Sequence, residues 1–117
     1  NDPRFEIVKS PPSLTSLMQK ASVAIISFGI TVYETAICQL PSIVISHSDE
    51  NDSAAKFVEN FGWILYLGKY NEIVYDDIPK MIFNLMNNKK KLQKMIKSCK
   101  QIDGLGPSNV ANSIINL

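Results

Sequence analysis

The chain has 117 residues, of which 45% are hydrophobic and 20% are charged, and its formal net charge is +1. This balance is typical of a folded globular protein and excludes an intrinsically disordered chain. The length fits one domain, which can bury roughly two-thirds of its unfolded surface around a single core. A net charge so close to zero gives no electrostatic sign of a nucleic-acid partner, so we expect none.

The two cysteines, Cys38 and Cys99, are too few for a disulfide framework and lack the spacing of a metal motif. Both occupy apolar positions of predicted helices, which predicts reduced core thiols in a cytoplasmic protein. The longest apolar run, residues 23–26, is far shorter than the ~20 residues that span a bilayer, and no signal peptide is visible. The chain starts abruptly at Asn1 without a methionine, which predicts a piece of a longer protein.

Apolar patterns predict strands that alternate with helices. Residues 5–8 are a short run that predicts a first strand, and apolar residues at helical spacing predict a helix over 13–21. Continuous apolar runs at 22–27, 42–46 and 63–67 predict strands that are covered on both faces, as in a parallel sheet.

Helices are predicted between and after these strands. One runs from about Thr31 to Leu40 and ends before Pro41, and the next ends near Gly62. Further helices are expected around the apolar positions of 78–85, 92–99 and 110–115. This alternation predicts an α/β fold, Rossmann-like with three α/β/α layers and about four parallel strands.

The stretch from Ser27 to Glu34 carries the strongest indication of chemistry. A buried strand ends in Ser27-Phe28-Gly29 and passes directly into a helix that begins near Thr31. Strand carboxyl ends form the ligand face of a parallel α/β sheet, and helix N-termini at that face attract anions such as a diphosphate. Gly29 permits a bend and the close approach of a ligand, and Glu34 is placed to accept hydrogen bonds from a ribose diol.

The same residues also have a purely structural interpretation. Thr31-x-x-Glu34 has the spacing of a capping box, in which the hydroxyl and the carboxylate each accept a hydrogen bond from a backbone N–H at the helix start. Spacing alone leaves capping and ligand binding open, and the two roles are compatible.

Five short motifs follow one another along the chain. They are Leu17-Met18-Gln19-Lys20-Ala21, Ser27-Phe28-Gly29, Thr31-Val32-Tyr33-Glu34, Leu40-Pro41 with the strand that follows it, and Ile102-Asp103-Gly104-Leu105-Gly106. In this order and spacing they resemble the C-terminal nucleotide-sugar-binding half of GT-B enzymes. The likeness is above all to the UDP-sugar hydrolases of pseudaminic acid synthesis and to spore-coat polysaccharide biosynthesis proteins. The lipid-linked N-acetylglucosaminyl transferase of peptidoglycan synthesis is more distantly similar.

The resemblance implies roles for individual residues. The Ser27–Gly29 turn and Thr31 would face the diphosphate of a UDP-sugar, and Glu34 would bind its ribose. The loop after the second buried strand stands where the family has an Asn-Gln pair that points at the donor, and Asn51 matches the asparagine.

Two positions depart from the family pattern. Asp52 stands in place of the glutamine, and because an acid repels a diphosphate, we interpret Asp52 as a cap for a helix that starts at Ser53. Ser22 replaces the usual aspartate of the Ala-Asp strand.

The only histidine, His47, follows a strand at the expected ligand face and is either a proton shuttle or a loop residue without a role. Catalytic residues cannot be assigned from spacing. The acids near it, Asp49, Glu50 and Asp52, do not form the loop pattern of a hard-cation site, so we expect neither a metal nor another cofactor.

Lysines are dense near the C-terminus, and Lys89, Lys90 and Lys91 begin a basic amphipathic helix. Such a helix either makes weak contact with an anionic membrane surface or forms a solvated outer face over an ordinary core stripe.

These observations predict that residues 1–117 are a single, partial domain. It would be the UDP-sugar-binding portion of a nucleotide-sugar hydrolase or glycosyltransferase of surface-polysaccharide biosynthesis. The catalytic groups would come from an N-terminal domain of the parent chain, so this portion alone is expected to be inactive. The alternative is a stand-alone flavodoxin-like or response-regulator-like α/β interaction domain without catalysis. A response regulator carries a phospho-accepting aspartate at a strand end, whereas the predicted strands of this chain end in Ser27, Ser46 and Leu67.

Overall fold

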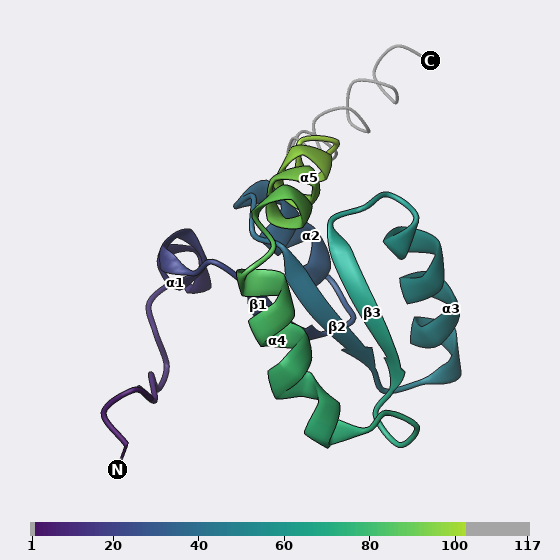
Figure 1. Ribbon diagram of the computed structural model, residues 1–117, viewed down its shortest axis with the longest axis horizontal. Coiled ribbons are helices and arrows are strands. Elements are labelled where there is room, and N and C mark those ends of the chain that lie inside the picture. Colours follow the sequence, from purple (N-terminus) through teal and green to yellow (C-terminus); the bar gives the residue numbers. More distant parts are fainter. Residues whose placement is uncertain (1, 103–117) are drawn as a thin grey trace.

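The computed structural model describes residues 2–102, and its centre is a three-stranded parallel sheet flanked by helices (Figure 1). The strands are β1 (Ala24–Ser27), β2 (Ser42–Ser46) and β3 (Ile64–Lys69), in the spatial order β1-β2-β3. The register pairs Ile26 with Val44 and Val44 with Tyr66, and β2 and β3 shift register after Val44.

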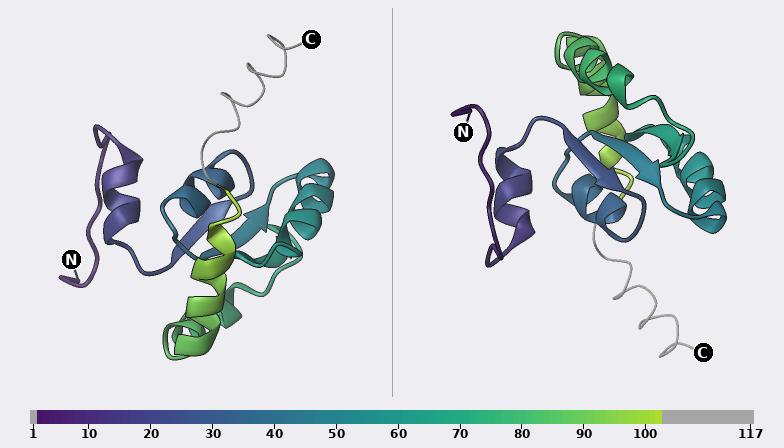
Figure 2. Two further views of the ribbon diagram at one scale, coloured as in Figure 1. Left: turned by 90° about the horizontal axis from the view of Figure 1, so that it is seen from above. Right: turned by 90° about the horizontal axis from the view of Figure 1, so that it is seen from below.

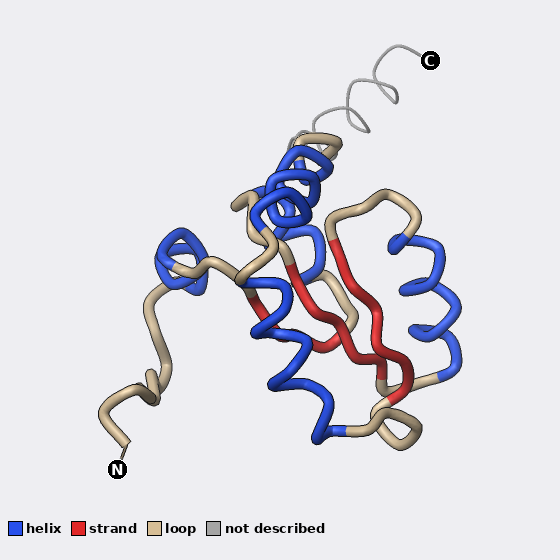
Figure 3. The backbone as a smooth tube through the Cα atoms, in the orientation of Figure 1, coloured by secondary structure: helices blue, strands red, loops and turns tan. Residues whose placement is uncertain are grey.

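Helices connect and follow the strands (Figure 3). They are α1 (Leu14–Lys20), α2 (Thr31–Ile37), α3 (Asp49–Glu59), α4 (Ile78–Met86) and α5 (Lys89–Cys99), with a short 3₁₀ helix, η1 (Tyr75–Asp77), before α4. The described residues therefore confirm an α/β fold with a parallel sheet, in agreement with a Rossmann-like arrangement.

Helices cover both faces of the sheet (Figure 2). On one face, Val32 of α2 and Val58 of α3 pack around Val44. On the other face, Leu85 of α4 and Met95 of α5 pack with Ile43 of the same strand. Because β2 is buried from both sides, its continuous apolar run predicted the strand correctly.

Trp63 joins α2 and α5 to the start of β3. Its side chain is 2% exposed and its indole N–H donates to the carbonyl oxygen of Val32 at 3.2 Å. Cys99, at the end of α5, belongs to the same core cluster and is fully buried. The end of α5 thus lies near the amino end of β3, at the edge of the sheet opposite the strand carboxyl ends (Figure 1).

The predicted first strand at residues 5–8 is not present. These residues belong to neither a strand nor a helix, and Phe5 and Ile7 are 77% and 85% exposed. The described sheet therefore has three strands where about four were expected. A strand needs a neighbouring backbone for its hydrogen bonds, and a short apolar run does not supply that partner.

The helix α1 forms as predicted, but none of its residues is buried. Ser13 caps it, since its hydroxyl accepts from the N–H of Thr15 at 3.1 Å. Leu14 and Leu17 remain 51% and 37% exposed, and the helix lies apart from the sheet (Figure 1). Its apolar stripe is therefore not part of either core cluster.

The helix predicted to reach Leu40 ends earlier, at Ile37. Cys38 is its C-cap residue, and Gln39 takes a positive φ of 55°. The prediction of two core thiols is thus correct for Cys99 and wrong for Cys38, which is only partly buried at the helix end.

Some predictions lie outside the described residues: the last helix after Pro107 and the Asp103-Gly104-Leu105-Gly106 part of the closing motif. Between residues 2 and 102, no helix is both long enough and apolar enough to cross a membrane.

Gly62 should be needed for stability. It has a φ of +102°, and a Cβ added there would lie 2.6 Å from the Oγ of Ser98. We expect Gly62→Ala to lower the free energy of unfolding by roughly 1–3 kcal/mol in urea titrations, because alanine strains this backbone and crowds α5. Gly29→Ala is the matched control, since a Cβ there meets nothing within 4 Å. Equal stabilities for the two variants would contradict this account.

Candidate functional site

The carboxyl ends of all three strands lie at one edge of the sheet, and the loops that leave them form the candidate site (Figure 1). Backbone hydrogen bonds connect the loops after β1 and β3 to the end of β2. The N–H of Phe28 donates to the carbonyl of Ile45, and the N–H of Tyr70 donates to the carbonyl of Ser46, both at 2.8 Å. The loops after β1, β2 and β3 are therefore held side by side, as expected for the ligand face of a parallel sheet.

The turn between β1 and α2 is open. Ser27 and Ile30 are exposed, and Phe28 and Gly29 are half-buried. A side chain built onto Gly29 would meet no atom within 4 Å, so the backbone of this turn is accessible to a ligand.

The capping box, one of the two interpretations that the Thr31-x-x-Glu34 spacing left open, is not formed. The N-cap residue of α2 is Ile30, and it makes no side-chain capping bond. Thr31 is already the first helical residue, and the backbone N–H of Glu34 donates to the carbonyl of Ile30 at 3.3 Å. A capping box needs its threonine at the N-cap position, which Ile30 occupies, one residue before Thr31. Helix capping therefore does not explain the carboxylate of Glu34.

The helix α3 starts four residues before the predicted position. Its N-cap is Ser48, whose hydroxyl accepts from the N–H of Asn51 at 3.1 Å. Asp52 is therefore not a cap for a helix starting at Ser53, and that interpretation is wrong. Asn51 lies in the first turn of α3, at the strand carboxyl edge, next to the loop that holds His47.

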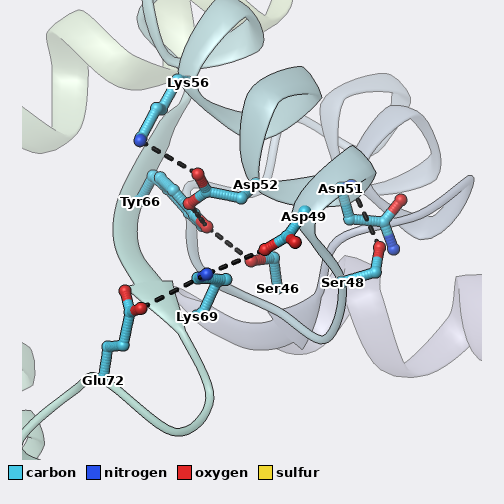
Figure 4. Close-up of polar contacts among 9 residues, drawn as sticks. All are labelled: Ser46, Ser48, Asp49, Asn51, Asp52, Lys56, Tyr66, Lys69 and Glu72. Atoms are coloured by element: carbon cyan, nitrogen blue, oxygen red, sulfur yellow. Dashed lines mark hydrogen bonds and ion pairs between the residues drawn. The ribbon is translucent and has the colours of Figure 1, made fainter.

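Asp52 instead belongs to a hydrogen-bond network centred on Tyr66 (Figure 4). The hydroxyl of Tyr66 donates to Oδ1 of Asp52 at 2.5 Å and lies 2.5 Å from Oγ of Ser46, which must donate in return. The other oxygen of Asp52 pairs with the Lys56 ammonium at 2.9 Å. The network connects the first turn of α3 to the end of β2 and to the middle of β3.

This network shifts the titration of its members. The hydrogen bond from Tyr66, followed by that from Lys56, holds the pKa of Asp52 below its usual value. Burial, followed by the hydrogen bond to Asp52, raises the pKa of the Tyr66 phenol. The carboxylate therefore stays charged and the phenol stays protonated at neutral pH, the pair of states that the hydrogen bond requires.

A second ion pair lies at the end of β3. Lys69 pairs with Asp49 of α3 at 2.8 Å and with Glu72 at 3.3 Å, and these partners raise the pKa of its ammonium (Figure 4). β3 reaches Lys69 through Gly68, whose φ is +126°, and so extends beyond its predicted end at Leu67. The pairs are solvent-exposed, so they orient the loop more than they stabilise the fold.

His47 is exposed and stacks on the ring of Tyr70, with centroids 5.2 Å apart and planes 11° apart. The stack links the loop after β2 to the loop after β3. It presents an imidazole and a phenol ring at the same edge as the Ser27–Gly29 turn.

The seven predicted site residues thus fall at one edge, on two neighbouring loops and the helices that follow them. They are Ser27, Phe28, Gly29, Thr31 and Glu34 on the first loop and α2, and His47 and Asn51 on the second loop and α3. Sequence reasoning missed Tyr66, Lys69 and Tyr70. A tyrosine inside an apolar strand was the available signal for Tyr66, because a buried phenol needs a hydrogen-bond partner.

A cavity of about 360 Å³ lies beside the end of β3 and is lined in part by Tyr66, Glu72 and Asp77. Within residues 2–102, no three histidine, cysteine or carboxylate side chains are grouped as metal ligands would be.

Comparison with known proteins identifies a distant relative. The chain is 29% identical over 75 residues to the spore coat polysaccharide biosynthesis protein SpsG of Bacillus subtilis (strain 168). The matched residues are 64% of this chain and 22% of SpsG, so they span about a fifth of that protein's length. No family model and no solved structure matches the chain. The predicted likeness to spore-coat polysaccharide proteins is therefore confirmed as a distant relationship, while the GT-B assignment stays a prediction.

Asp52 should make the stability of the protein depend on pH. A carboxyl whose folded pKa is depressed contributes stability above its unfolded pKa of about 3.9, and loses that contribution as the pH falls through the folded value. We expect wild type to be more stable than Asp52→Asn near neutral pH, and the difference to shrink below about pH 4. Urea titrations across pH measure this. Glu50→Gln, at an exposed position of the same helical turn, should follow wild type at every pH. A gap between wild type and Asp52→Asn that is the same at pH 3 and pH 7 would contradict the prediction.

Proposed function

We propose that this chain forms part of the nucleotide-sugar-binding domain of a cytoplasmic enzyme of surface-polysaccharide biosynthesis, of the GT-B type. The observation that carries the proposal is the open Ser27–Gly29 turn, which leads from a buried parallel strand into α2. The distant relationship to a protein named for spore coat polysaccharide biosynthesis supports the same class of pathway. The proposed ligand is a UDP-sugar.

Charge favours α2 over α3 as the place of the diphosphate. The first turn of α3 holds Asp49, Glu50 and Asp52, whereas the acid in the first turn of α2 is Glu34. Carboxylates at a helix start repel an anion that the backbone N–H groups would otherwise attract. We therefore place the diphosphate over the Ser27–Gly29 turn and Thr31, and the ribose hydroxyls at Glu34.

The segment from the end of β2 to the first turn of α3 would contribute further contacts to the site. The side chain of Asn51 is a neutral donor and acceptor, so it suits contact with a sugar or a phosphate without the penalty that an acid brings. The imidazole of His47 is exposed and stacks on Tyr70, and we assign it to the neighbourhood of the donor sugar.

Catalysis would need groups from outside this chain. The matched stretch is 22% of SpsG, and a GT-B site lies between two domains. We therefore propose that the parent enzyme is a UDP-sugar hydrolase or a glycosyltransferase, and that residues 1–117 by themselves bind nucleotide without turning it over.

Titration with UDP, followed through backbone amide chemical shifts, tests the proposal. The largest shifts are expected in residues 27–34 and 47–52, where the two loops meet the edge. Uridine, which lacks the diphosphate, is the control ligand and should move Glu34 while leaving the Ser27–Gly29 turn unchanged. Shifts concentrated elsewhere, or none at all, would overturn the proposal and favour the stand-alone interaction domain.

Glu34→Gln separates binding from folding. An ionised acceptor contributes about twice the free energy of a neutral one, so losing the charge at a ribose diol should weaken UDP binding roughly tenfold. The melting temperature should change by no more than about 2 °C, because Glu34 caps nothing in α2. Calorimetric titration and thermal melts measure both. Glu6→Gln removes an equal charge from the exposed N-terminal segment and should leave UDP affinity within about twofold. Equal affinities for wild type and Glu34→Gln would remove Glu34 from the site.

A further inference from the structure

The charges of this chain are separated along its length. The whole chain has 12 basic and 11 acidic side chains. Seven of the basic ones and none of the acidic ones lie in residues 78–100, which leaves five basic and eleven acidic side chains, a balance of −6, in the rest. The seven are Lys80, Lys89, Lys90, Lys91, Lys94, Lys97 and Lys100. The net charge of +1 is therefore the sum of a strongly basic segment, residues 78–100, and an acidic remainder of the chain.

The structure puts this segment on α4 and α5, which contact each other and follow one another along the chain (Figure 2). All seven lysines are exposed. Lys90, Lys94 and Lys97 recur at helical spacing on the side of α5 opposite Met95 and Cys99, which are buried. Lys90, Lys94 and Lys97 therefore form a basic stripe on the outer side of α5, and this stripe with the exposed lysines around it on α4 and α5 is here called the α4–α5 surface.

Within residues 2–102, the ion pairs of the fold do not involve these lysines. The lysines that pair with carboxylates are Lys56 and Lys69, both outside the segment. The acidic side chain beyond the described residues is Asp103, and a single carboxylate does not balance seven ammonium groups. The positive potential of the α4–α5 surface is thus available to an outside partner.

An exposed aromatic side chain lies beside one of these lysines. Phe83 is 67% exposed and lies one helical turn from Lys80 on α4. The segment has no arginine, since the chain's sole arginine is Arg4. Lysine acts as a mobile point charge, whereas arginine forms the two-pronged hydrogen bonds that recognise individual phosphates. Lysines around an apolar side chain suit the diffuse negative charge of a lipid surface better than a nucleic acid.

We propose that the α4–α5 surface binds peripherally to an anionic lipid bilayer, with its lysines at the headgroups and Phe83 inserted beneath them. The surface includes Lys89, Lys90 and Lys91. The end of α5 lies at the amino ends of the strands, at the edge of the sheet opposite the Ser27–Gly29 turn (Figure 1). The proposal does not depend on nucleotide binding.

Co-sedimentation with lipid vesicles tests the proposal. The full chain should bind vesicles of mixed phosphatidylcholine and phosphatidylglycerol, bind pure phosphatidylcholine far more weakly, and dissociate at high salt. Each lysine near an anionic surface contributes about 1 kcal/mol, so the triple variant Lys90→Gln, Lys94→Gln, Lys97→Gln should lose on the order of 100-fold in affinity. The matched control, Arg4→Gln, Lys9→Gln, Lys20→Gln, removes the same charge from the N-terminal region and should lose less than about fivefold. Circular dichroism checks that both variants remain folded.

Three outcomes would overturn the proposal. One is the absence of binding to the anionic vesicles. Another is an equal loss in the two triple variants, which would show that net charge alone controls the contact. The third is tighter binding of duplex RNA than of vesicles at matched salt, which would assign the surface to nucleic acid.

Discussion

The architecture depends on β2, a strand that is buried on both faces. Ile43 faces the helices α4 and α5, Val44 faces α2 and α3, and neither side chain has any exposed surface. Such a strand is stable only if helices cover both sides, and parallel neighbours require crossover helices that provide this cover. Because both faces of β2 are occupied by packing, the chain meets solvent beyond the end of β2, where His47 is exposed. The candidate site lies there for that reason.

Ser46 connects this core to the site. It is the last residue of β2, and although its side chain is fully buried, its hydroxyl must keep a hydrogen-bond partner. Tyr66 from β3 supplies that partner, and its hydroxyl also donates a hydrogen bond to Asp52 in the first turn of α3. The loop between β2 and α3 is thereby attached to the rigid sheet at one end and to a fixed helical turn at the other. His47 and Asn51 owe their positions to this attachment.

The charged side chains of residues 2–102 fall into two regions of opposite sign. The strand carboxyl edge is rich in carboxylates, and Lys56 and Lys69 compensate part of this charge. The lysines of α4 and α5 have no such compensation among residues 2–102. This separation explains why composition alone indicated neither an anionic ligand nor an anionic surface. It also bears on the proposed diphosphate, because the first turn of α3 carries Asp49, Glu50 and Asp52, whereas that of α2 carries Glu34 alone.

Some features follow from local pattern and others from distant contacts. Continuous apolar runs determined β2 and β3, and Ser27-Phe28-Gly29 at the end of an apolar run determined the open turn before α2. Burial of both faces and a strand-to-helix turn are encoded within a few neighbouring residues. By contrast, residues 5–8 have the composition of a strand but gain no partner, and the Thr31–Glu34 spacing fits a capping box that does not form.

The role of Asp52 was decided only by tertiary structure. Its partner Tyr66 is 14 residues away on another element, and the two meet because the crossover lays α3 against β3. Hydrogen bonds between elements depend on how those elements pack, and spacing along the chain does not carry that information.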